Sequence, residues 1–166
     1  MSVNSFRKKC QEIPRTDNIF GLCDDQNGTK AYSNTSSPKK WIASIKNDNK
    51  IEITFTAIDN CIIIFKKHTK YKESTCDGMI TFSDSVYLVE LKKQKTEGWI
   101  SDALGQLENT MKLFQTNPVI TQCKYKKAFA CNKKHPGFHT IDNEKNKWFF
   151  RNYGFRIDIQ DEIIIK

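Results

Sequence analysis

Residues 76–93, CDGMITFSDSVYLVELKK, constrain the fold of this chain more than any other segment. Two runs rich in β-branched and aromatic residues, 76–82 and 85–93, flank a Ser-Asp pair that is typical of a tight turn, so the segment predicts a β-hairpin. Side chains alternate between the two faces of a strand, which places Glu90 and Lys92 on the same face. An acid and a base on an otherwise apolar strand are costly to bury without partners or a task.

The turn decides which residue of the first strand faces this pair. If Ser83 and Asp84 form a two-residue turn, counting back along the strand places Asp77 opposite Glu90. If the turn shifts by one residue, Asp77 lies opposite Lys92 instead. In either register the three charged groups cluster on one face, because directly opposed Cβ atoms lie roughly 5 Å apart.

Two carboxylates held this close repel each other unless a cation joins them. Asp77 and Glu90 therefore predict a site for a divalent metal, with the backbone carbonyl of Leu91 as a further ligand. Mg²⁺ suits such a site because it takes few protein oxygens and accepts phosphate oxygens, and we expect Mn²⁺ to substitute for it. The metal would polarise a phosphoryl group and produce hydroxide from water, while Lys92 would stabilise the developing negative charge. The alternative is a structural Glu-Lys pair on an exposed edge strand.

An acid at the start of one strand, followed by acid-x-Lys on the next, resembles the PD-(D/E)xK nuclease superfamily. Asp77, Glu90 and Lys92 supply this pattern in order, although Cys76 stands where the family usually has a proline. The resemblance covers roughly residues 38–131. It implies an α/β fold of the restriction-endonuclease-like kind, in which a central mixed β-sheet is flanked by helices.

The resemblance also implies site residues beyond the hairpin. Many members carry a glutamine on the next helix, near the metal-bound water or the substrate backbone, and Gln106 matches that position. A solvated helix glutamine is the alternative interpretation of Gln106. Some members add an acid from the first helix, for which Glu12 is the nearest candidate, because the helix expected after Pro38 has no acid on its body.

The remaining elements are predicted from periodicity and turn residues. Apolar residues recur with helical spacing over residues 99–114, which predicts a long amphipathic helix. Ser37 and Pro38 indicate the start of another helix, running through Ile45. The other expectations are a short helix over 1–12, an irregular stretch over 13–36, strands over 50–57, 61–67 and 124–131, a loop over 135–147, and a β-rich C-terminal tail with two strand runs in 155–166. A length of 166 residues suits a single domain, residues 1–166.

The charge of the chain agrees with a polyanionic partner without requiring one. Its 27 basic and 19 acidic residues give a net charge of +8, and the alternative is a solvated lysine-rich surface. The residues that we expect to contact nucleic acid are Lys93 and Lys95 beside the hairpin, Trp99 at the start of the following helix, and Lys39 and Lys40. For Trp99, packing in the core is an equal alternative to stacking on a base.

Six cysteines are present, and no apolar stretch is long enough to cross a membrane. The N-terminus lacks the features of a signal peptide, so we expect a cytoplasmic protein with free thiols rather than disulfides. Cys123, Cys131, His135 and His139 are four residues of the types that bind zinc, but seven residues separate the two cysteines, which favours strand cysteines and loop histidines.

These features predict a Mg²⁺-dependent DNA endonuclease acting in restriction, phage defence or DNA repair. An RNA-cleaving toxin or effector of the same fold is one alternative. A non-catalytic nucleic-acid-binding module is another, although such a module would be expected to lose Asp77, Glu90 or Lys92. A homodimer is plausible because cutting a duplex needs two active sites or two visits.

Overall fold

The structure, a computed structural model, describes residues 9–166 and shows a mixed α/β protein. In this part of the chain two mixed β-sheets are accompanied by three α-helices, with strand orders β2-β1-β3-β9 and β4-β5-β6-β7-β8. The elements are β1 Ile19–Cys23, β2 Tyr32–Asn34, β3 Ala43–Lys46, β4 Thr54–Ala57, β5 Gly78–Phe82, β6 Ser85–Lys92, α1 Trp99–Phe114, α2 Pro118–Thr121, β7 Tyr125–Asn132, α3 Asn143–Tyr153, β8 Arg156–Ile159 and β9 Glu162–Ile164.

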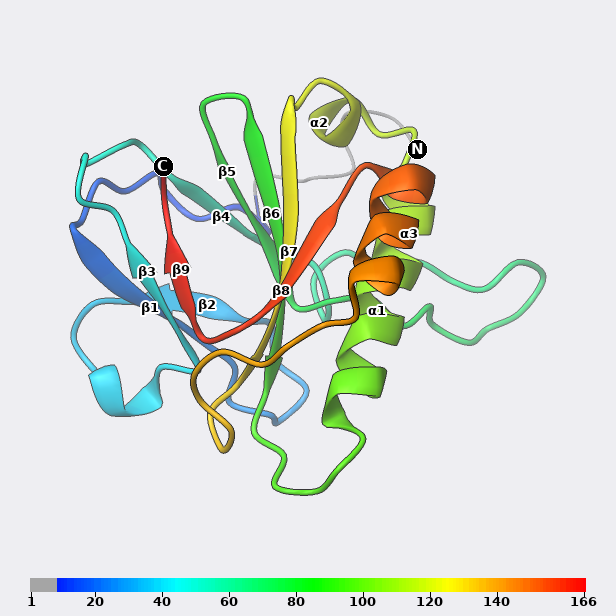
Figure 1. The fold of residues 1–166 in the computed structure, drawn as a ribbon, viewed down its shortest axis with the longest axis horizontal. Coiled ribbons are helices and arrows are strands. Elements are labelled where there is room, and N and C mark those ends of the chain that lie inside the picture. The colour runs from blue at the N-terminus through cyan, green and yellow to red at the C-terminus, as the bar shows by residue number, and fades with distance from the viewer. Residues whose placement is uncertain (1–8) are drawn as a thin grey trace.

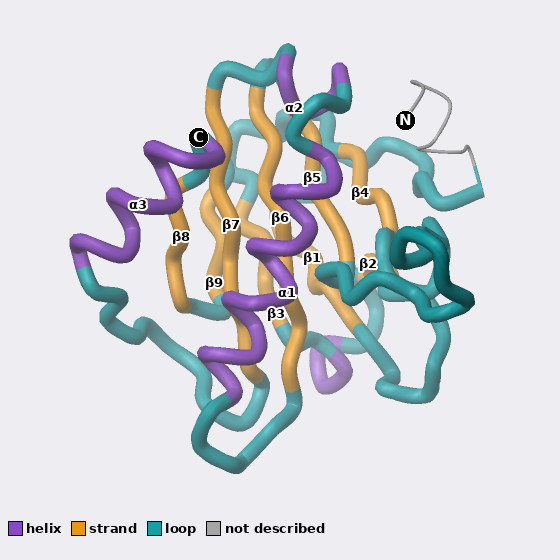
Figure 2. Tube along the Cα trace, turned by 90° about the vertical axis from the view of Figure 1, so that its right-hand side faces the viewer, coloured by secondary structure: helices purple, strands orange, loops and turns teal. Residues whose placement is uncertain are grey.

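The five-stranded sheet is the middle of three layers. The helices α1 and α3 cover one of its faces and the four-stranded sheet covers the other (Figures 1 and 2). Strand β6 runs through the centre of the middle layer and alternates between the two cores: Val86 and Leu88 face the helices, whereas Tyr87 and Val89 face the second sheet. This division is the one that the alternation of the sequence predicts.

The long helix predicted over residues 99–114 is confirmed as α1, with the same bounds. Gly98 precedes the helix with a left-handed φ of 88°, and the buried stripe includes Ala103, Leu107 and Met111. These residues pack on the five-stranded sheet, which fixes the position of α1 beside β6. The strand predicted over 124–131 is likewise confirmed as β7, parallel to β6.

The prediction of a helix after Pro38 is wrong. The proline starts only a single 3-10 turn, Pro38–Lys40, and Ser37 makes no side-chain capping bond. The chain then forms strand β3, which pairs with β1 on one side and with β9 on the other. Ile45 is fully buried in this strand. A β-branched residue with partners on both sides is better accommodated in a sheet, so tertiary pairing overrides the local start signal.

Two further segments differ from expectation in the first half of the chain. The stretch 13–36 is not an irregular loop, because β1 and β2 lie within it and form an antiparallel pair. The predicted strand 61–67 is absent, and this segment begins a projecting loop with a single bridge between Phe65 and Lys72. The strand predicted over 50–57 is confirmed only over Thr54–Ala57, as β4.

The last part of the loop expected over 135–147 is the beginning of helix α3. The predicted loop over 135–147 ends at Asp142, whose side chain accepts a hydrogen bond from the Glu144 N–H and caps α3. The β-rich tail is confirmed, and its two strands join different sheets, β8 pairing with β7 and β9 with β3. The tail therefore connects the two sheets.

The short helix expected over residues 1–12 falls largely on residues 1–8, which lie outside the described part of the chain. Gln11 forms an isolated antiparallel bridge with Thr56. Between residues 9 and 166, no helix combines the length and the apolar character needed to cross a membrane.

Candidate active site

The hairpin of β5 and β6 has the first of the two registers that its sequence allows. Phe82 pairs with Ser85, so the turn is the two-residue Ser83-Asp84 turn, and Ser83 has a left-handed φ of 48°. The ladder continues back to Gly78 opposite Val89. One step further, the Asp77 carboxylate accepts a hydrogen bond of 2.6 Å from the Leu91 N–H. The hairpin therefore places Asp77 beside the acid-x-Lys segment of β6.

Gly78, directly after the first acid, allows β5 to approach β4 closely. A Cβ atom at this position would lie 2.5 Å from the ring of Phe55 and 2.9 Å from the carbonyl oxygen of Thr56. Both belong to β4, the partner of β5 on the other side. Only a glycine allows this approach, so the Asp-Gly pair at the start of β5 combines an acid with a tight strand contact.

The other predicted site residues converge on the same face. The Lys92 ammonium lies 2.9 Å from Glu90 Oε1 and also donates a hydrogen bond to Gln106 Oε1 on α1. The Gln106 amide in turn donates to the carbonyl oxygen of Thr75, at 3.2 Å, just before Asp77. Gln106 is thus bound into the site, and the alternative of a solvated helix glutamine does not describe it. Lys92 is held between an acid and an amide, which fixes the direction of its ammonium group.

Asp77 and Glu90 are both buried, and burial raises the pKa of each. Glu90 is 2% exposed and Asp77 is 6% exposed. Desolvation raises the pKa of Glu90 to about 7, against the opposing influence of Lys92. Desolvation, followed by the charge of Glu90, raises the pKa of Asp77 well above its usual value. Glu90 Oε2 is buried with no hydrogen-bond partner. Two buried carboxylates and one lysine leave negative charge that a cation would compensate.

Two acids that sequence reasoning did not select complete the surroundings of the pair. Asp24 is buried at the end of β1, and its charge contributes to the raised pKa of Asp77. Asp59 lies in the turn after β4, and its charge contributes to the raised pKa of Glu90. Both line a cavity of about 190 Å³ with Asp77, Glu90, Leu91, Lys92, Gln106, Gln26, Gly28 and Asn60. An acid directly after the apolar run IFGLC was the available signal for Asp24, but it required recognising that run as a strand.

The donor set fits a hard divalent cation. Asp77, Glu90 and Leu91 line the cavity together, the Leu91 carbonyl lies 3.5 Å from the Gln26 amide nitrogen, and Glu90 Oε2 has no hydrogen-bond partner. Within residues 9–166, no three Asp, Glu, His or Cys side chains form a metal-ligand cluster by themselves. The carbonyl of Leu91, water and substrate oxygens would therefore complete the coordination, which is how Mg²⁺ is commonly bound.

A larger, open cavity adjoins the site on the side of α1. Its volume is about 630 Å³, and Lys92 and Gln106 line both cavities. Other lining residues include Ser101 and Asp102 at the start of α1 and Lys66 and Glu73 on the loop before β5. The Lys92 ammonium therefore stands between a small acid-rich cavity and a wide one that is open to solvent.

The remaining predicted contact residues lie outside the two cavities. Glu12, the suggested extra acid, accepts hydrogen bonds from the Ser33 N–H, at 2.7 Å, and from the Ser33 hydroxyl. Lys39, Lys40 and Lys95 are exposed and Lys93 is half-buried, so all four remain open to a ligand without lining either cavity. Asp24 and Asp59, rather than Glu12, are the additional acids beside the pair.

Trp99 cannot stack on a base in this arrangement. The indole is 5% exposed, and its ring is stacked with the ring of His135 and packed edge-on against His139. The expectation of a base contact at Trp99 is therefore wrong, and the alternative of core packing is confirmed. Trp99 anchors the start of α1 against the loop that follows β7.

The expectation of free thiols is wrong for two of the six cysteines, because Cys10 and Cys61 form a disulfide. Cys10 and Cys61 are 51 positions apart in the sequence, and only the fold brings them together. Disulfides persist mainly in oxidising compartments, so the pair argues against one premise of the cytoplasmic location, which stays a prediction. Among residues 9–166, Cys23, Cys76, Cys123 and Cys131 are free.

The two cysteines and two histidines considered as zinc ligands have other partners. The Cys123 thiol contacts the carbonyl oxygen of Val119, and Cys131 is buried in the core between the sheets. His139 Nε2 lies 3.1 Å from the carbonyl oxygen of His135, and both rings pack on Trp99. The four side chains thus serve different parts of the fold.

No known protein family, no curated protein and no solved structure matches this chain.

Proposed function

We propose that this protein is a divalent-metal-dependent nuclease that hydrolyses phosphodiester bonds in DNA. The observation that carries the proposal is the buried pair Asp77 and Glu90, with Lys92 bound between Glu90 and Gln106. The mixed sheet and the helix α1 after the hairpin agree with the resemblance to PD-(D/E)xK nucleases, which implies the same residues. The net charge of +8 suits a polyanionic substrate.

Asp77, Glu90 and the Leu91 carbonyl would hold Mg²⁺ or Mn²⁺. When bound, the metal supplies Lewis acidity toward a phosphoryl oxygen and lowers the pKa of a water ligand. Glu90 and Gln106 hold the ammonium of Lys92 at the mouth of the open cavity, where it donates hydrogen bonds to a non-bridging phosphate oxygen and stabilises the charge that develops there. Because Gln106 is bound to the backbone at Thr75, the position of the ammonium is set before substrate arrives.

The test is cleavage of plasmid and oligonucleotide DNA with Mg²⁺, with Mn²⁺ and with EDTA. Lys92→Ala is expected to lower the rate by about 10²- to 10³-fold, because an electrostatic contact to the transition state is lost. Asp77→Asn, which keeps the shape of the side chain, is expected to abolish metal-dependent cleavage. Single-stranded DNA, branched DNA and RNA in the same panel decide the substrate class.

Lys46→Ala is the matched control. Lys46 forms an ion pair of 2.9 Å with Glu162, the same length as the pair between Lys92 and Glu90, but it is exposed and lies on the four-stranded sheet. This variant should cleave like the original protein. Undiminished cleavage by folded Lys92→Ala and Asp77→Asn proteins, checked by circular dichroism, would contradict the proposal.

A further inference from the structure

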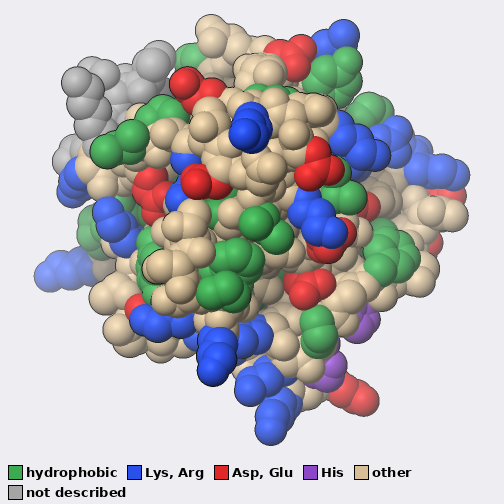
Figure 3. Space-filling model, turned by 90° about the vertical axis from the view of Figure 1, so that its left-hand side faces the viewer, with side chains coloured by type: hydrophobic (Ala, Val, Ile, Leu, Met, Phe, Trp, Pro, Cys, Tyr) green, Lys and Arg blue, Asp and Glu red, His purple; other side chains and the backbone are tan. Residues whose placement is uncertain are grey.

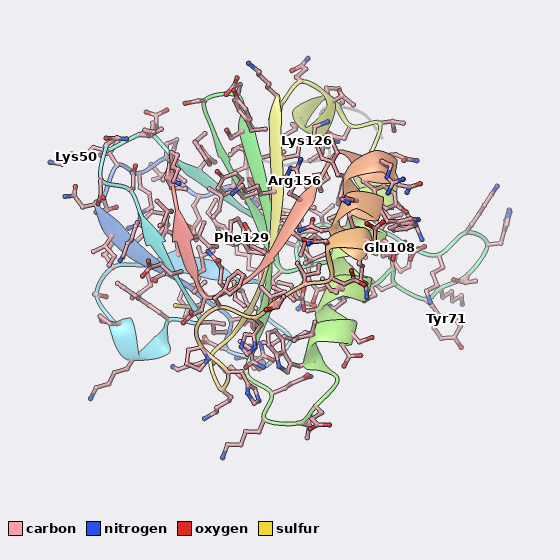
Figure 4. All side chains as sticks on the ribbon, viewed as in Figure 1. Lys50, Tyr71, Glu108, Lys126, Phe129 and Arg156 are labelled. Carbon is pink, nitrogen blue, oxygen red and sulfur yellow. A yellow bond between two sulfur atoms is a disulfide. The ribbon has the colours of Figure 1, made fainter. Side chains whose placement is uncertain are left out.

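A projecting loop, residues 63–72, stands beside the candidate active site and is called the arm here. Its two sides run antiparallel: the Lys66 N–H donates to the Tyr71 carbonyl at 2.8 Å, and the Glu73 N–H donates to the Ile64 carbonyl at 2.7 Å. Phe65 and Lys72 form the bridge between these bonds. Figure 1 shows the arm extending away from the body of the molecule beyond α1, and Figure 4 places Tyr71 on this extension.

The base of the arm is attached to the walls of both cavities. The Lys72 ammonium lies 2.7 Å from Asp59 Oδ1 and 3.0 Å from Asn60 Oδ1, and both partners line the acid-rich cavity. On the other side, the Asn109 amide of α1 donates to Glu73 Oε2 at 3.1 Å and to the Ser74 carbonyl at 2.7 Å. Lys66 of the arm and Lys92 line the same open cavity, so a ligand bound along the arm would extend toward Lys92.

The surface of the arm combines exposed aromatic rings with lysines, one of which, Lys72, is paired with Asp59. Phe65 is 59% exposed and Tyr71 is 75% exposed. Residues 61–72 contain four lysines and no acid. Phe65 pairs with Lys72, and Lys66 with Tyr71, so alternation along the arm gives each face one ring and one lysine. By contrast, acidic and basic side chains are interspersed over much of the opposite face of the molecule (Figure 3).

We infer that the arm binds a single-stranded segment of nucleic acid, stacking unpaired bases on Phe65 and Tyr71 while its lysines contact the phosphates. Aromatic rings bind bases of any sequence because every base has a π-face, and lysines beside them follow the backbone. A purely apolar partner would leave the lysines unpaired, and a purely anionic one would leave the rings in water. The inference deepens the proposed function and rests on it for the fate of the bound strand.

Binding is measured by fluorescence anisotropy in EDTA, with a labelled single-stranded DNA oligonucleotide and the matching duplex. EDTA separates binding from cleavage. Tyr71→Ala is expected to weaken single-strand binding about 5- to 100-fold, because one stacked base is lost, and Phe65→Ala should act similarly. Tyr71→Phe keeps the ring and should retain most of the affinity. The duplex, whose bases are already stacked, should bind more weakly and respond less to both substitutions.

Phe138→Ala is the control, because Phe138 is 69% exposed and belongs to the loop after β7, which Figure 1 shows apart from the arm. It should bind like the original protein. Unchanged single-strand binding by the double variant F65A/Y71A would overturn the inference, as would a Tyr71-dependent preference for vesicles of phosphatidylserine and phosphatidylcholine. If the arm variants lose binding but no protein cleaves any substrate with metal, the proposed function fails while the binding site stands.

Discussion

The acid-rich cavity and the arm differ in how their charged groups meet solvent, although Asp59 lines the cavity and also contacts Lys72 of the arm. In the cavity, Asp77 and Glu90 are almost completely buried, and burial raises the pKa of both. On the arm, by contrast, the lysines are exposed to solvent. Under the proposed function, a small, highly charged cation would offset the cost of ionising the buried acids, whereas the exposed lysines between aromatic rings would suit an extended polyanion.

One short segment connects the acid-rich cavity to the arm. Asp59 and Asn60 line the cavity, and both contact Lys72 of the arm. Cys61 follows directly and is bonded to Cys10. Changes that act on the cavity alone, on the arm alone, or on this connecting segment should therefore have separable effects.

The largest effect on stability is expected at the disulfide. Replacing both partners, C10S/C61S, should lower the free energy of unfolding by about 2–4 kcal/mol, because the unfolded chain loses a closed loop. Urea unfolding followed by circular dichroism measures it. Cys123→Ser, which removes a free thiol, is the control. Equal unfolding midpoints for the double variant and the original protein would show that the bond does not stabilise the fold.

The buried acids predict a pH dependence of the metal-free protein. The pKa of Glu90 is about 7 in the folded state against an ordinary 4.5, so the folded state binds its proton more tightly than the unfolded chain. Stability should therefore fall as pH rises from about 4.5 to 7, by at most about 3 kcal/mol for this one group. The raised pKa of Asp77 acts in the same direction.

Urea unfolding in EDTA between pH 5 and pH 8 tests this dependence. Glu90→Gln cannot ionise and should lose less stability over that range, whereas Glu162→Gln, in an exposed pair, should behave like the original protein. A pH profile unaffected by Glu90→Gln would contradict the cause assigned here. Added Mg²⁺ should stabilise the original protein most at the high end, where both acids are ionised.

Asp24→Asn tests the acid that the second sheet contributes to the cavity. We expect it to weaken divalent-metal binding about 10- to 100-fold, because a neighbouring charge that favours the cation is removed. Isothermal titration calorimetry with Mg²⁺ and Mn²⁺ measures it. Asp25→Asn is a close control, because Asp25 adjoins Asp24 but is exposed and does not line the cavity. Equal losses in both variants would argue for a general charge effect.

The smallest expected effect is on the salt dependence of binding by the arm. The variant K66Q/K67Q should reduce the slope of log affinity against log salt for single-stranded DNA by about one to one and a half, since each phosphate contact contributes roughly 0.7. Lys50→Gln is the control, because Figure 4 shows Lys50 on the opposite side of the molecule from Tyr71. An unchanged slope would indicate that the lysines of the arm do not contact phosphates.

Sequence reasoning reached the parts of the site that depend on local spacing. Asp77, Glu90 and Lys92 lie on one hairpin, where alternation and a two-residue turn bring them together. Gln106 lies on a helix whose apolar stripe already determined which side faces the sheet. Counting along the chain suffices for such residues because a single element, or two adjacent ones, positions them.

Asp24, Asp59 and the Cys10–Cys61 disulfide were not found in this way. Asp24 belongs to the four-stranded sheet and reaches the cavity only because that sheet packs on the five-stranded one. The same packing turned the expected helix after Pro38 into β3, since its residues had strand partners on both sides. Pairing between distant segments has no local signature in the sequence.

By itself, then, the sequence determined the hairpin, the helix α1 and the acid-x-Lys face, because periodicity and turn chemistry act over a few residues. Only the tertiary structure decided that the face is buried, that further acids surround it, and that a basic aromatic arm stands at its edge. Burial and long-range pairing depend on which surfaces meet when the layers pack. Burial in the packed structure raises the pKa of Asp77 and Glu90, and this effect cannot be read from the sequence.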